Sequence, residues 1–564
     1  MWRWATAACL ALTATGTAIG ASPRADAAAR PAVFPASNRL FMISDSVGLG
    51  AIPQMKAAFG AGWQVTVAGK AGLFTEQLVN YVNTQPLSVF GDSAVVATGY
   101  NYPYWDPPRF ERSIDLMVNA LKAKGVKRIF WVTVREVKPP YYRYWNSLTA
   151  AYKSLYLGYP TANNQIRKAL DRHKELSIVD WASIADQYGI TYDAIHLNPV
   201  GATKYAALTK AMVLTATTRR PAGTVTTIQV AGTRDIPADA AAVSLNLTTV
   251  NPRRGGYLTV WPCEEARPQV AHLSHAPAQT VSTPTLVHLG PSGTLCLYQS
   301  ADGHALVDLN GWFPAGSGYV PMASQQLWDT TRTGAPAPRA VTEIRVANAT
   351  GAPAPPFDAV VNLRTTAVTA GEVRMYTCGT TPPLVPGRTL EAGQTMTLTQ
   401  VVTTDAEGDV CVQFTGVGHE WLTVVGGFDA TADLTPFTNR RIVDTRFTGG
   451  ALQPGQVRTV TVAGAVGIPT APAPTGAWLS VTMVDAADSA SVKVWPCNDP
   501  TPGQVFLYTL PNHAKSNVGL IGLGLSGAVC LSTNVAGNVL VDASGWTGTS
   551  FVPRAWTRLL DTRA

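Results

Sequence analysis

Short apolar runs and segments of helical periodicity alternate along the first third of the chain. The apolar runs predict five buried strands, at residues 39–43, 63–67, 94–97, 128–132 and 176–179. The segments between them predict helices at 52–59, 73–82, 110–124 and 165–174. Strands that alternate with helices form parallel sheets with helices on their faces. We therefore expect an α/β three-layer sandwich with a parallel sheet over residues 39–215.

The rest of the chain changes to a period of two. Residues 243–248 and 480–484 alternate apolar with polar side chains, as half-buried strands do. Pro, Gly, Thr and Asn interrupt these segments at short intervals. The pattern predicts three all-β modules, expected to be β-sandwiches, at 222–332, 340–446 and 457–564.

Cysteines support the division into three modules. Apart from Cys9 they form three pairs, and the partners are 33 residues apart in each: Cys263 with Cys296, Cys378 with Cys411, and Cys497 with Cys530. The equal spacing predicts one disulfide per module, each contributing roughly 3–4 kcal/mol in the chain-entropy model. Short motifs recur as well: Trp-Pro-Cys at 261–263 and 495–497, Val-Asp at 307–308 and 541–542, and Asp-Thr-Arg at 444–446 and 561–563.

The first 27 residues have the pattern of a secretory signal peptide. A short basic start precedes an apolar run from Ala5 to Gly20, and Ala25-Asp26-Ala27 offers a cleavage site. Residues 28–38 then form a linker. No other stretch approaches 18 consecutive apolar residues. We expect a secreted, extracellular protein without an integral membrane anchor, either free or associated with the cell wall, and export makes disulfides chemically permissible.

Composition narrows the class of protein further. Charged residues make up 14% of the chain and hydrophobic residues 46%, which excludes a disordered chain and a coiled coil. Residues 28–215 hold 20 Lys and Arg against 12 Asp and Glu. This excess fits either an acidic cell-envelope polymer as partner or a scattered, solvated surface. Because it forms no basic cluster, nucleic-acid binding is not expected.

Polar residues follow the predicted strands, at the sheet edge where parallel α/β proteins carry their sites. The first strand leads into 44–48 (Ser-Asp-Ser-Val-Gly), the second into 69–72 (Gly-Lys-Ala-Gly) and the third into 99–101 (Gly-Tyr-Asn). A serine hydroxyl becomes a nucleophile when a histidine, held by a carboxylate, takes its proton. Of the two histidines in this domain, His173 lies on a predicted solvated helix face, whereas His196 has Asp193 three residues before it.

Other chemistries fit less well. The N-terminal domain has no cysteine, which excludes a thiol nucleophile there. His272 and His275 are three apart in the first module, but no further ligands cluster near them, so no metal is expected. Phosphate-loop and dinucleotide fingerprints are absent, and no cofactor is expected.

The four blocks, in this order, resemble the SGNH (GDSL-type) hydrolase family over residues 39–215. The resemblance implies that Ser46 is the nucleophile, and that His196 and Asp193 complete a catalytic triad. It further implies an oxyanion hole made by the backbone N–H groups of Ser46 and Gly72 and by the side-chain amide of Asn101. The three disulfide-containing β modules resemble repeats of a secreted bacterial type.

This sequence departs from the family pattern at two positions. Ser44 stands where the family has Gly in its first block, and Tyr102 stands where an Asp often follows the block-three Asn. Aromatic residues are dense after the third and fourth strands, and they could line a sugar or acyl pocket or pack on the scaffold. These groups are Tyr100, Tyr102, Tyr104 and Trp105, and then Tyr141, Tyr142, Tyr144 and Trp145.

The sequence therefore predicts a secreted serine esterase that removes an acyl group, expected to be O-acetyl, from a carbohydrate or other ester substrate. One alternative is an O-acyltransferase that uses the same site. Another is a non-catalytic wall-binding or adhesive protein. The β modules would contact a cell-envelope polymer or act as spacers.

Overall fold

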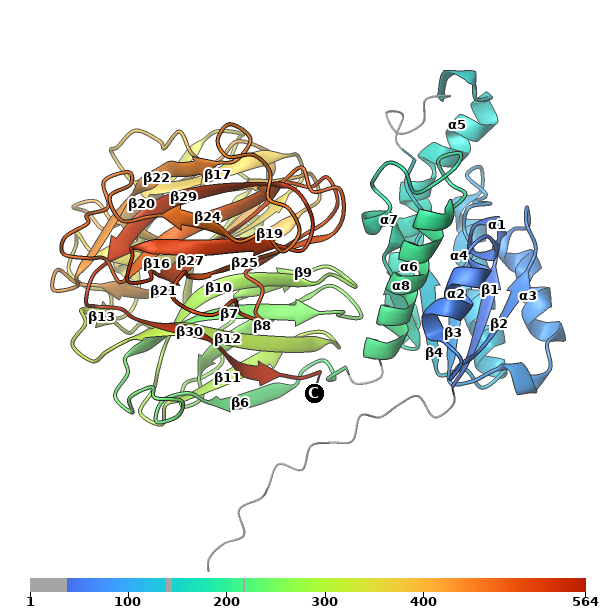
Figure 1. The fold of residues 1–564 in the computed structure, drawn as a ribbon, viewed down its shortest axis with the longest axis horizontal. Helices are drawn as coiled ribbons and strands as arrows, with labels where there is room; N and C mark the ends of the chain where they lie inside the picture. Colours follow the sequence, from blue (N-terminus) through green and yellow to red (C-terminus); the bar gives the residue numbers. More distant parts are fainter. Residues whose placement is uncertain (1–37, 138–144, 217–218, 564) are drawn as a thin grey trace, which may run out of the picture.

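An α/β domain is followed by a larger all-β part (Figure 1). The structure is a computed structural model, and it describes residues 38–137, 145–216 and 219–563. The predicted signal peptide, and the linker up to residue 37, lie outside the described residues. Within the described part, no helix is long and apolar enough to span a membrane.

The α/β domain contains a five-stranded parallel sheet of order β2-β1-β3-β4-β5. Its strands are β1 (Arg39–Ser44), β2 (Gln64–Gly69), β3 (Ser93–Ala97), β4 (Arg128–Val132) and β5 (Leu176–Val179). The predicted strands are confirmed within one or two residues. β1, β3 and β5 are almost entirely buried, as their continuous apolar runs require when helices cover both faces.

Helices cover the two faces of this sheet in two groups. α2 packs on α8, whereas α4 lies between α3 and α6. The chain also forms the short helices α1, α5 and α7. The bounds are α1 (Ser46–Leu49), α2 (Ile52–Phe59), α3 (Thr75–Thr84), α4 (Pro107–Ala123), α5 (Ala150–Leu157), α6 (Tyr159–Arg172), α7 (Trp181–Ile184) and α8 (Pro199–Thr215). The three-layer prediction is confirmed.

The β part is built from three units, each with two antiparallel sheets. Unit 1 consists of the sheets β10-β7-β12-β30 and β6-β11-β8-β9. Unit 2 consists of the sheets β13-β21-β16-β19, in which β14 is also hydrogen-bonded to β21, and β15-β20-β17-β18. Unit 3 consists of the sheets β22-β29-β24-β27 and β23-β28-β25-β26.

The strands of unit 1 are β6 (Val225–Gln229), β7 (Ala242–Val250), β8 (Gly256–Pro262), β9 (Leu273–His275), β10 (Val281–His288), β11 (Thr294–Gln299) and β12 (His304–Phe313). Those of unit 2 are β13 (Tyr319–Val320), β14 (Gln325–Asp329), β15 (Val341–Arg345), β16 (Asp358–Ala367), β17 (Gly371–Thr377), β18 (Arg388–Leu390), β19 (Thr395–Thr403), β20 (Asp409–Phe414) and β21 (Gly418–Phe428). Those of unit 3 are β22 (Leu434–Asp444), β23 (Arg458–Thr461), β24 (Gly476–Val484), β25 (Ala490–Pro496), β26 (Leu507–Thr509), β27 (Lys515–Gly522), β28 (Ala528–Thr533) and β29 (Asn538–Thr547). The final strand, β30 (Val552–Asp561), belongs to a sheet of unit 1.

The three units surround a common axis in a propeller-like arrangement. β10, β19 and β27 contact one another along this axis, one strand from each unit. Leu286, Val401 and Leu520 on these strands join a shared core, while each unit has its own core between its two sheets. The prediction of three separate β-sandwiches is therefore wrong: the units share a core and exchange strands.

The last strand of the chain closes the ring. β30 pairs with β12 of unit 1, although the two are separated in sequence by units 2 and 3. The recurring motifs lie at this junction. Arg558 of β30 forms ion pairs with buried Asp308, from a Val-Asp motif, and with Asp561, from an Asp-Thr-Arg motif. Arg441 makes the equivalent contacts with Asp542 and Asp444 between β22 and β29. The Val-Asp and Asp-Thr-Arg motifs thus hold the exchanged strands.

Each unit carries one disulfide, with the pairing that the equal spacing predicts. Cys263–Cys296, Cys378–Cys411 and Cys497–Cys530 are bonded. Each bridge joins the residue directly after one strand to the third residue of the paired strand, as Cys263 after β8 is bonded to Cys296 within β11. The bridges therefore fix the outer sheets within their units and do not link one unit to the next.

The α/β domain docks on the β part through polar contacts. Asn512 donates to the carbonyl of Asp186 at 2.8 Å, and Lys204 forms an ion pair with Asp488. His513 lies between two carboxylates, Asp186 of the α/β domain and Glu391 of unit 2. Hydrogen bonds to these carboxylates raise the pKa of His513 to about 9. His513 is therefore a charged link between the two parts.

We predict that Arg558→Met destabilises the β part by about 3 kcal/mol, because it leaves the Asp308 carboxylate buried without its partner. Burial already raises the pKa of Asp308 to about 6 with Arg558 beside it. Arg563→Met is the matched control: it removes an exposed pair with Asp561 and should change the unfolding free energy by less than about 1 kcal/mol. Denaturant unfolding measures both values, and equal effects would contradict this role of β30.

We also predict that the contact between the two parts weakens at alkaline pH. A histidine whose pKa is raised stabilises the folded state fully below its ordinary value of about 6.5, and this contribution is lost as pH rises through about 9. Hydrogen exchange of residues 185–190, corrected for the intrinsic effect of pH, should increase over that range. His513→Gln should remove the dependence; an unchanged profile in this variant would contradict the assignment.

Candidate active site

Three of the predicted site residues, Ser46, His196 and Asp193, meet at the carboxyl edge of the parallel sheet. The chain leaves β1 toward β2 on one side and leaves β3 toward β4 on the other, so the loops after β1 and β3 diverge at a topological switch point, the crevice in which open α/β sheets bind their ligands. Ser46 follows β1, Asn101 follows β3, and His196 lies in the loop before α8.

Ser46 is placed by the tight turn that ends β1. Asp45 caps the short helix α1 by accepting from the Val47 N–H at 3.2 Å, so that Ser46 is the first helical residue. Ser46 is half-buried, and its Oγ lies 3.0 Å from Nε2 of His196. The structure thus brings together two residues that are 150 positions apart.

Asp193 and His196 share one turn. Asp193 Oδ1 accepts from the backbone N–H groups of Ile195 at 3.2 Å and His196 at 2.7 Å, while Oδ2 lies 2.6 Å from Nδ1 of His196. Ala194 has a φ of 75°, a left-handed conformation that lets the turn fold back on itself. Partial burial favours the neutral acid, but the hydrogen bonds from His196 outweigh it and lower the pKa of Asp193. The ionised carboxylate favours a proton on Nδ1, which leaves Nε2 to accept from Ser46.

Asn101 presents an unpartnered donor. Its Nδ2 is buried and has no hydrogen-bond partner among the described residues. Buried amide nitrogens are nearly always paired, so this atom is available to an oxygen that enters the crevice. Gly72 lies in the exposed turn after β2 with a φ of 77°, a conformation that favours glycine.

Asp45, which the sequence analysis did not assign, holds the Asn101 loop in place. Its carboxylate is fully buried, and Oδ2 accepts from the N–H groups of Gly99 and Tyr100, both at 3.1 Å. Burial raises the pKa of Asp45 to about 6, although these backbone hydrogen bonds oppose the shift. The sequence signal for this role is the position of Asp45 in Ser-Asp-Ser, directly after β1. From there its side chain reaches the residues that follow the neighbouring strand β3.

Arg135 was also missed, and it holds the loop that carries Asp193 and His196. Its guanidinium is buried and donates to the carbonyl oxygens of Ala185 at 2.8 Å, Gln187 at 2.7 Å and Ala194 at 2.7 Å, and to the hydroxyl of Thr191 at 2.7 Å. Its position three residues after β4 was the available signal, because polar groups after strand ends face this crevice.

The two departures from the family pattern are accommodated. Ser44 is buried, and its hydroxyl donates to the carbonyl oxygens of Asp45 at 2.9 Å and Ala97 at 3.2 Å. Its Oγ fills the space that a Cβ on Gly48 would occupy, at 2.2 Å. Tyr102 is buried against Phe110 and belongs to the core.

Of the aromatic groups, Tyr100 and Tyr102 pack on the scaffold, whereas Trp105 is 59% exposed. Its ring meets Tyr104 and Phe74 edge to face, at 5.0 and 5.9 Å between centroids. Tyr141, Tyr142 and Tyr144 lie outside the described residues, and Trp145 packs near Tyr156. The exposed Trp105 is therefore the member of the third-strand group that offers a ring to a ligand.

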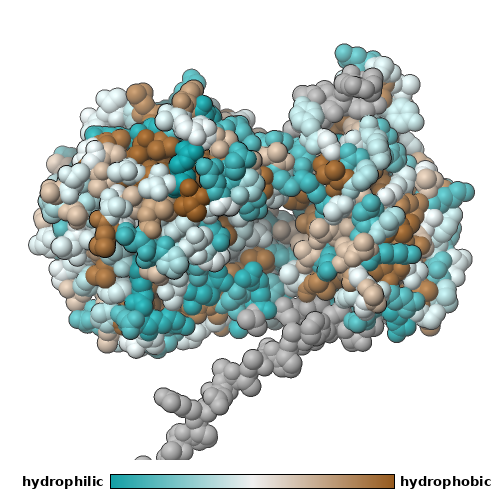
Figure 2. Space-filling model, viewed as in Figure 1, coloured by the Kyte–Doolittle hydropathy of each residue, from teal (hydrophilic) through white to brown (hydrophobic). Residues whose placement is uncertain are grey.

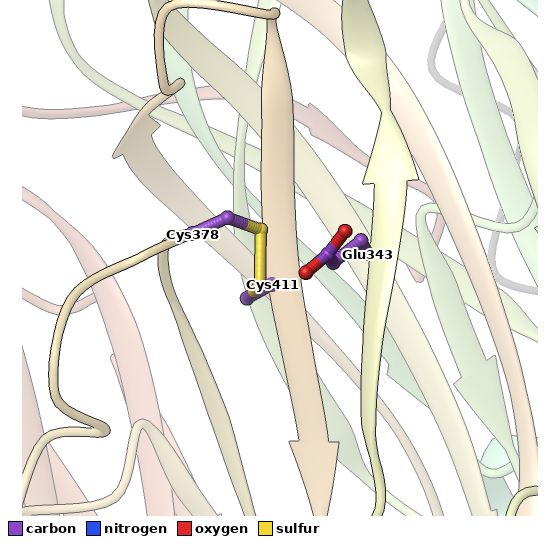
Figure 3. Close-up of side chains that lie close together, drawn as sticks. All are labelled: Glu343, Cys378 and Cys411. Carbon is purple, nitrogen blue, oxygen red and sulfur yellow. A yellow bond between two sulfur atoms is a disulfide. The ribbon is translucent and has the colours of Figure 1, made fainter.

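Among the described residues, one group of three potential metal ligands lies close together: Glu343, Cys378 and Cys411 (Figure 3). The two sulfurs form a disulfide and are not thiolates. Since thiolates are the sulfur ligands of metal ions, this group does not form a metal site. His272 and His275 are both buried, and burial lowers the pKa of each to about 4.

No family model and no curated protein matches the chain. Solved structures match the α/β part. The catalytic domain of peptidoglycan O-acetyltransferase A from Streptococcus pneumoniae is 20% identical, with a TM-score of 0.24, and the match covers 31% of this chain and 92% of that one. An acetyl xylan esterase is 17% identical, with a TM-score of 0.26, 31% coverage of this chain and 99% of that one. A GDSL-like lipase from Bacteroides thetaiotaomicron is 14% identical, with a TM-score of 0.25, 31% coverage of this chain and 87% of that one.

We predict that Arg135→Gln destabilises the α/β domain by about 3 kcal/mol or more, because several buried carbonyl oxygens lose their donor. Hydrogen exchange should increase most in residues 185–196. Arg172→Gln is the control, since Arg172 makes its ion pairs with Glu111 and Asp115 at the surface. If both variants unfold at the same denaturant concentration as the unchanged protein, Arg135 does not hold this loop.

Proposed function

We propose that this protein is a secreted serine esterase that hydrolyses an acyl ester, with Ser46, His196 and Asp193 as its catalytic triad. The observation that carries the proposal is the continuous chain of contacts from Ser46 Oγ to His196 Nε2, and from His196 Nδ1 to Asp193. The buried Nδ2 of Asn101, which has no partner among the described residues, supports it. Nucleophile, base, orienting carboxylate and oxyanion donor are the four parts that acyl transfer from an ester requires.

In the acylation step, Ser46 Oγ attacks the ester carbonyl carbon while its proton passes to Nε2 of His196. The negative charge develops on the carbonyl oxygen, where Asn101 Nδ2 and the N–H groups of Ser46 and Gly72 would donate to it. Asp193 stabilises the imidazolium. The tetrahedral intermediate then expels the alcohol oxygen, which takes the proton from His196, and an acyl-enzyme remains.

In the deacylation step, His196 takes a proton from water, and the resulting hydroxide attacks the acyl carbon. The bond to Ser46 breaks, and Ser46 Oγ regains its proton from His196. The crevice is open on this side, because the side chains of His196 and Asp193 are 42% and 47% exposed. This exposure favours entry of water and of an acyl group carried on a polymer surface.

The proposed substrate is a carbohydrate that carries a short acyl ester, expected to be O-acetyl. The resemblance to SGNH hydrolases supports an ester, and the exposed ring of Trp105 supports a sugar, since sugar rings stack on aromatic faces. A neighbour of this fold is an acetyl xylan esterase, and another is a peptidoglycan O-acetyltransferase. An acylated cell-envelope polymer is the substrate class that contains both an ester and a sugar and that a secreted protein would meet.

We predict that Ser46→Ala lowers turnover of a soluble acetyl ester by roughly 10⁴–10⁶ while the fold remains intact. Asn101→Ala should lower turnover by about 10²–10³, the effect of removing one oxyanion donor. Ser44→Ala is the matched control within Ser-Asp-Ser and should retain activity within about tenfold, since Ser44 bonds only to backbone carbonyls. A Ser46→Ala variant with undiminished activity would refute the mechanism.

A panel of acetylated glycans with labelled acetyl groups identifies the acceptor. Release of free acetate supports a hydrolase, whereas label on an added deacetylated glycan supports the O-acyltransferase alternative. If the unchanged protein turns over no ester, and a sulfonyl fluoride adds no mass to Ser46, the non-catalytic wall-binding alternative replaces the proposal.

A further inference from the structure

A large cavity lies where the β part meets the α/β domain. Its volume is about 1110 Å³, somewhat above the usual range for a small-molecule pocket. It is lined by residues of all three β units, near one end of their common axis, and by α6, α7 and α8. The space-filling view shows the seam between the two parts, with mostly hydrophilic or neutral residues along it (Figure 2). Ser46, Asn101, Asp193 and His196 do not line the cavity.

Two arginines in the wall have unused donors. Arg388 is 3% exposed; its Nη atoms donate to the backbone oxygens of Thr397 and Ser516, but its Nε has no partner among the described residues. Arg364 lies with its guanidinium 4.0 Å from the ring centroid of Trp421, and its Nε is likewise buried and unpaired within the described part of the chain. Guanidinium donors left unpaired in a protein interior are costly and call for an acceptor.

Lys515 adds a third positive charge. No hydrogen bond or ion pair of its ammonium group is present in the described residues. Burial lowers the pKa of Lys515 to about 7, and repulsion from Arg388 acts in the same direction. An anion in the cavity would oppose both effects.

The acidic residues of the cavity wall are already engaged. Asp180 accepts from Arg167 at 2.8 Å, and Glu391 binds the ring of His513. These carboxylates therefore do not neutralise Arg364, Arg388 and Lys515. The cavity keeps an excess of positive charge.

Neutral polar atoms without partners lie in the same wall. They are His275 Nδ1, Thr397 Oγ1 and Ser489 Oγ, one from each β unit. His275 is buried, and its lowered pKa keeps the ring neutral at physiological pH. The wall also holds the rings of Tyr257 and Tyr508. Hydroxyl and imidazole groups beside aromatic rings match the alternating polar and apolar faces of a sugar.

We propose that this cavity binds an acidic saccharide, with its carboxylate or phosphate group held by Arg364, Arg388 and Lys515. The ligand's hydroxyl groups would bond to His275, Thr397 and Ser489. The site is separate from the proposed catalytic centre and does not rest on the esterase assignment. It gives the β part a binding role that spans all three units and the α/β domain.

Isothermal titration calorimetry of the full chain tests this site with three probes: trigalacturonic acid, neutral galactotriose and inorganic phosphate. Trigalacturonic acid should bind more tightly than galactotriose by about tenfold or more, and Lys515→Met and Arg364→Gln should each weaken it about tenfold or more. Lys127→Met is the control, because Lys127 is exposed and does not line the cavity. Thermal unfolding verifies that each variant is folded, and Lys515→Met should hydrolyse a small ester at the unchanged rate.

The remaining outcomes assign or overturn the site. If phosphate displaces trigalacturonic acid, or binds alone, in a way that depends on Lys515, the ligand class extends to phosphate-bearing saccharides. If phosphate does not displace trigalacturonic acid, the ligand class is restricted to carboxylates. Equal binding of galactotriose, no binding of either anion, or unchanged binding by Lys515→Met overturns the proposal. Loss of ester hydrolysis in Ser46→Ala with saccharide binding intact would separate the two sites.

Discussion

The buried guanidinium of Arg135 is the interaction on which the arrangement of the site depends. It donates to the loop between α7 and α8 at four points, and its own backbone N–H donates to the hydroxyl of Tyr100 at 2.8 Å. Tyr100 in turn follows β3, next to Asn101. The side chain and the backbone of Arg135 thus join the loop of His196 to the loop of Asn101, while Asp45 joins the Asn101 loop to the turn that carries Ser46.

The same loop carries the docking contact with the β part. Asp186, between two residues that bond to Arg135, contacts His513 and accepts from Asn512 through its carbonyl. A rigid loop therefore serves two purposes, since it places His196 at the crevice and fixes the face on which the β units dock. The cavity proposed as a saccharide site lies at the same junction and is lined on the α/β side by residues of α6, α7 and α8.

The sequence predicted the α/β fold and the residues that meet at the crevice, because both leave local signals. Continuous apolar runs identify buried strands, and the Asp193–His196 turn is complete within four residues. Arg135 leaves only the weak signal of a polar residue shortly after a strand end, since most of its acceptors are backbone oxygens that any residue could supply. The arrangement of the β units was also beyond the sequence: a period of two identifies a strand and its faces but not its partner, and β30 pairs across about 250 positions with β12.

The pairing of β30 with β12 has a consequence for how the chain acquires its structure. The first β unit to leave the ribosome lacks one strand of its sheet, because β30 is made only after the strands of units 2 and 3. Until it arrives, β12 presents an open edge, and the shared core of the three units cannot close. The β part must therefore fold as a whole and late, through contacts of very long range, which are slow to form. The ring therefore cannot close before β30 is available to pair with β12.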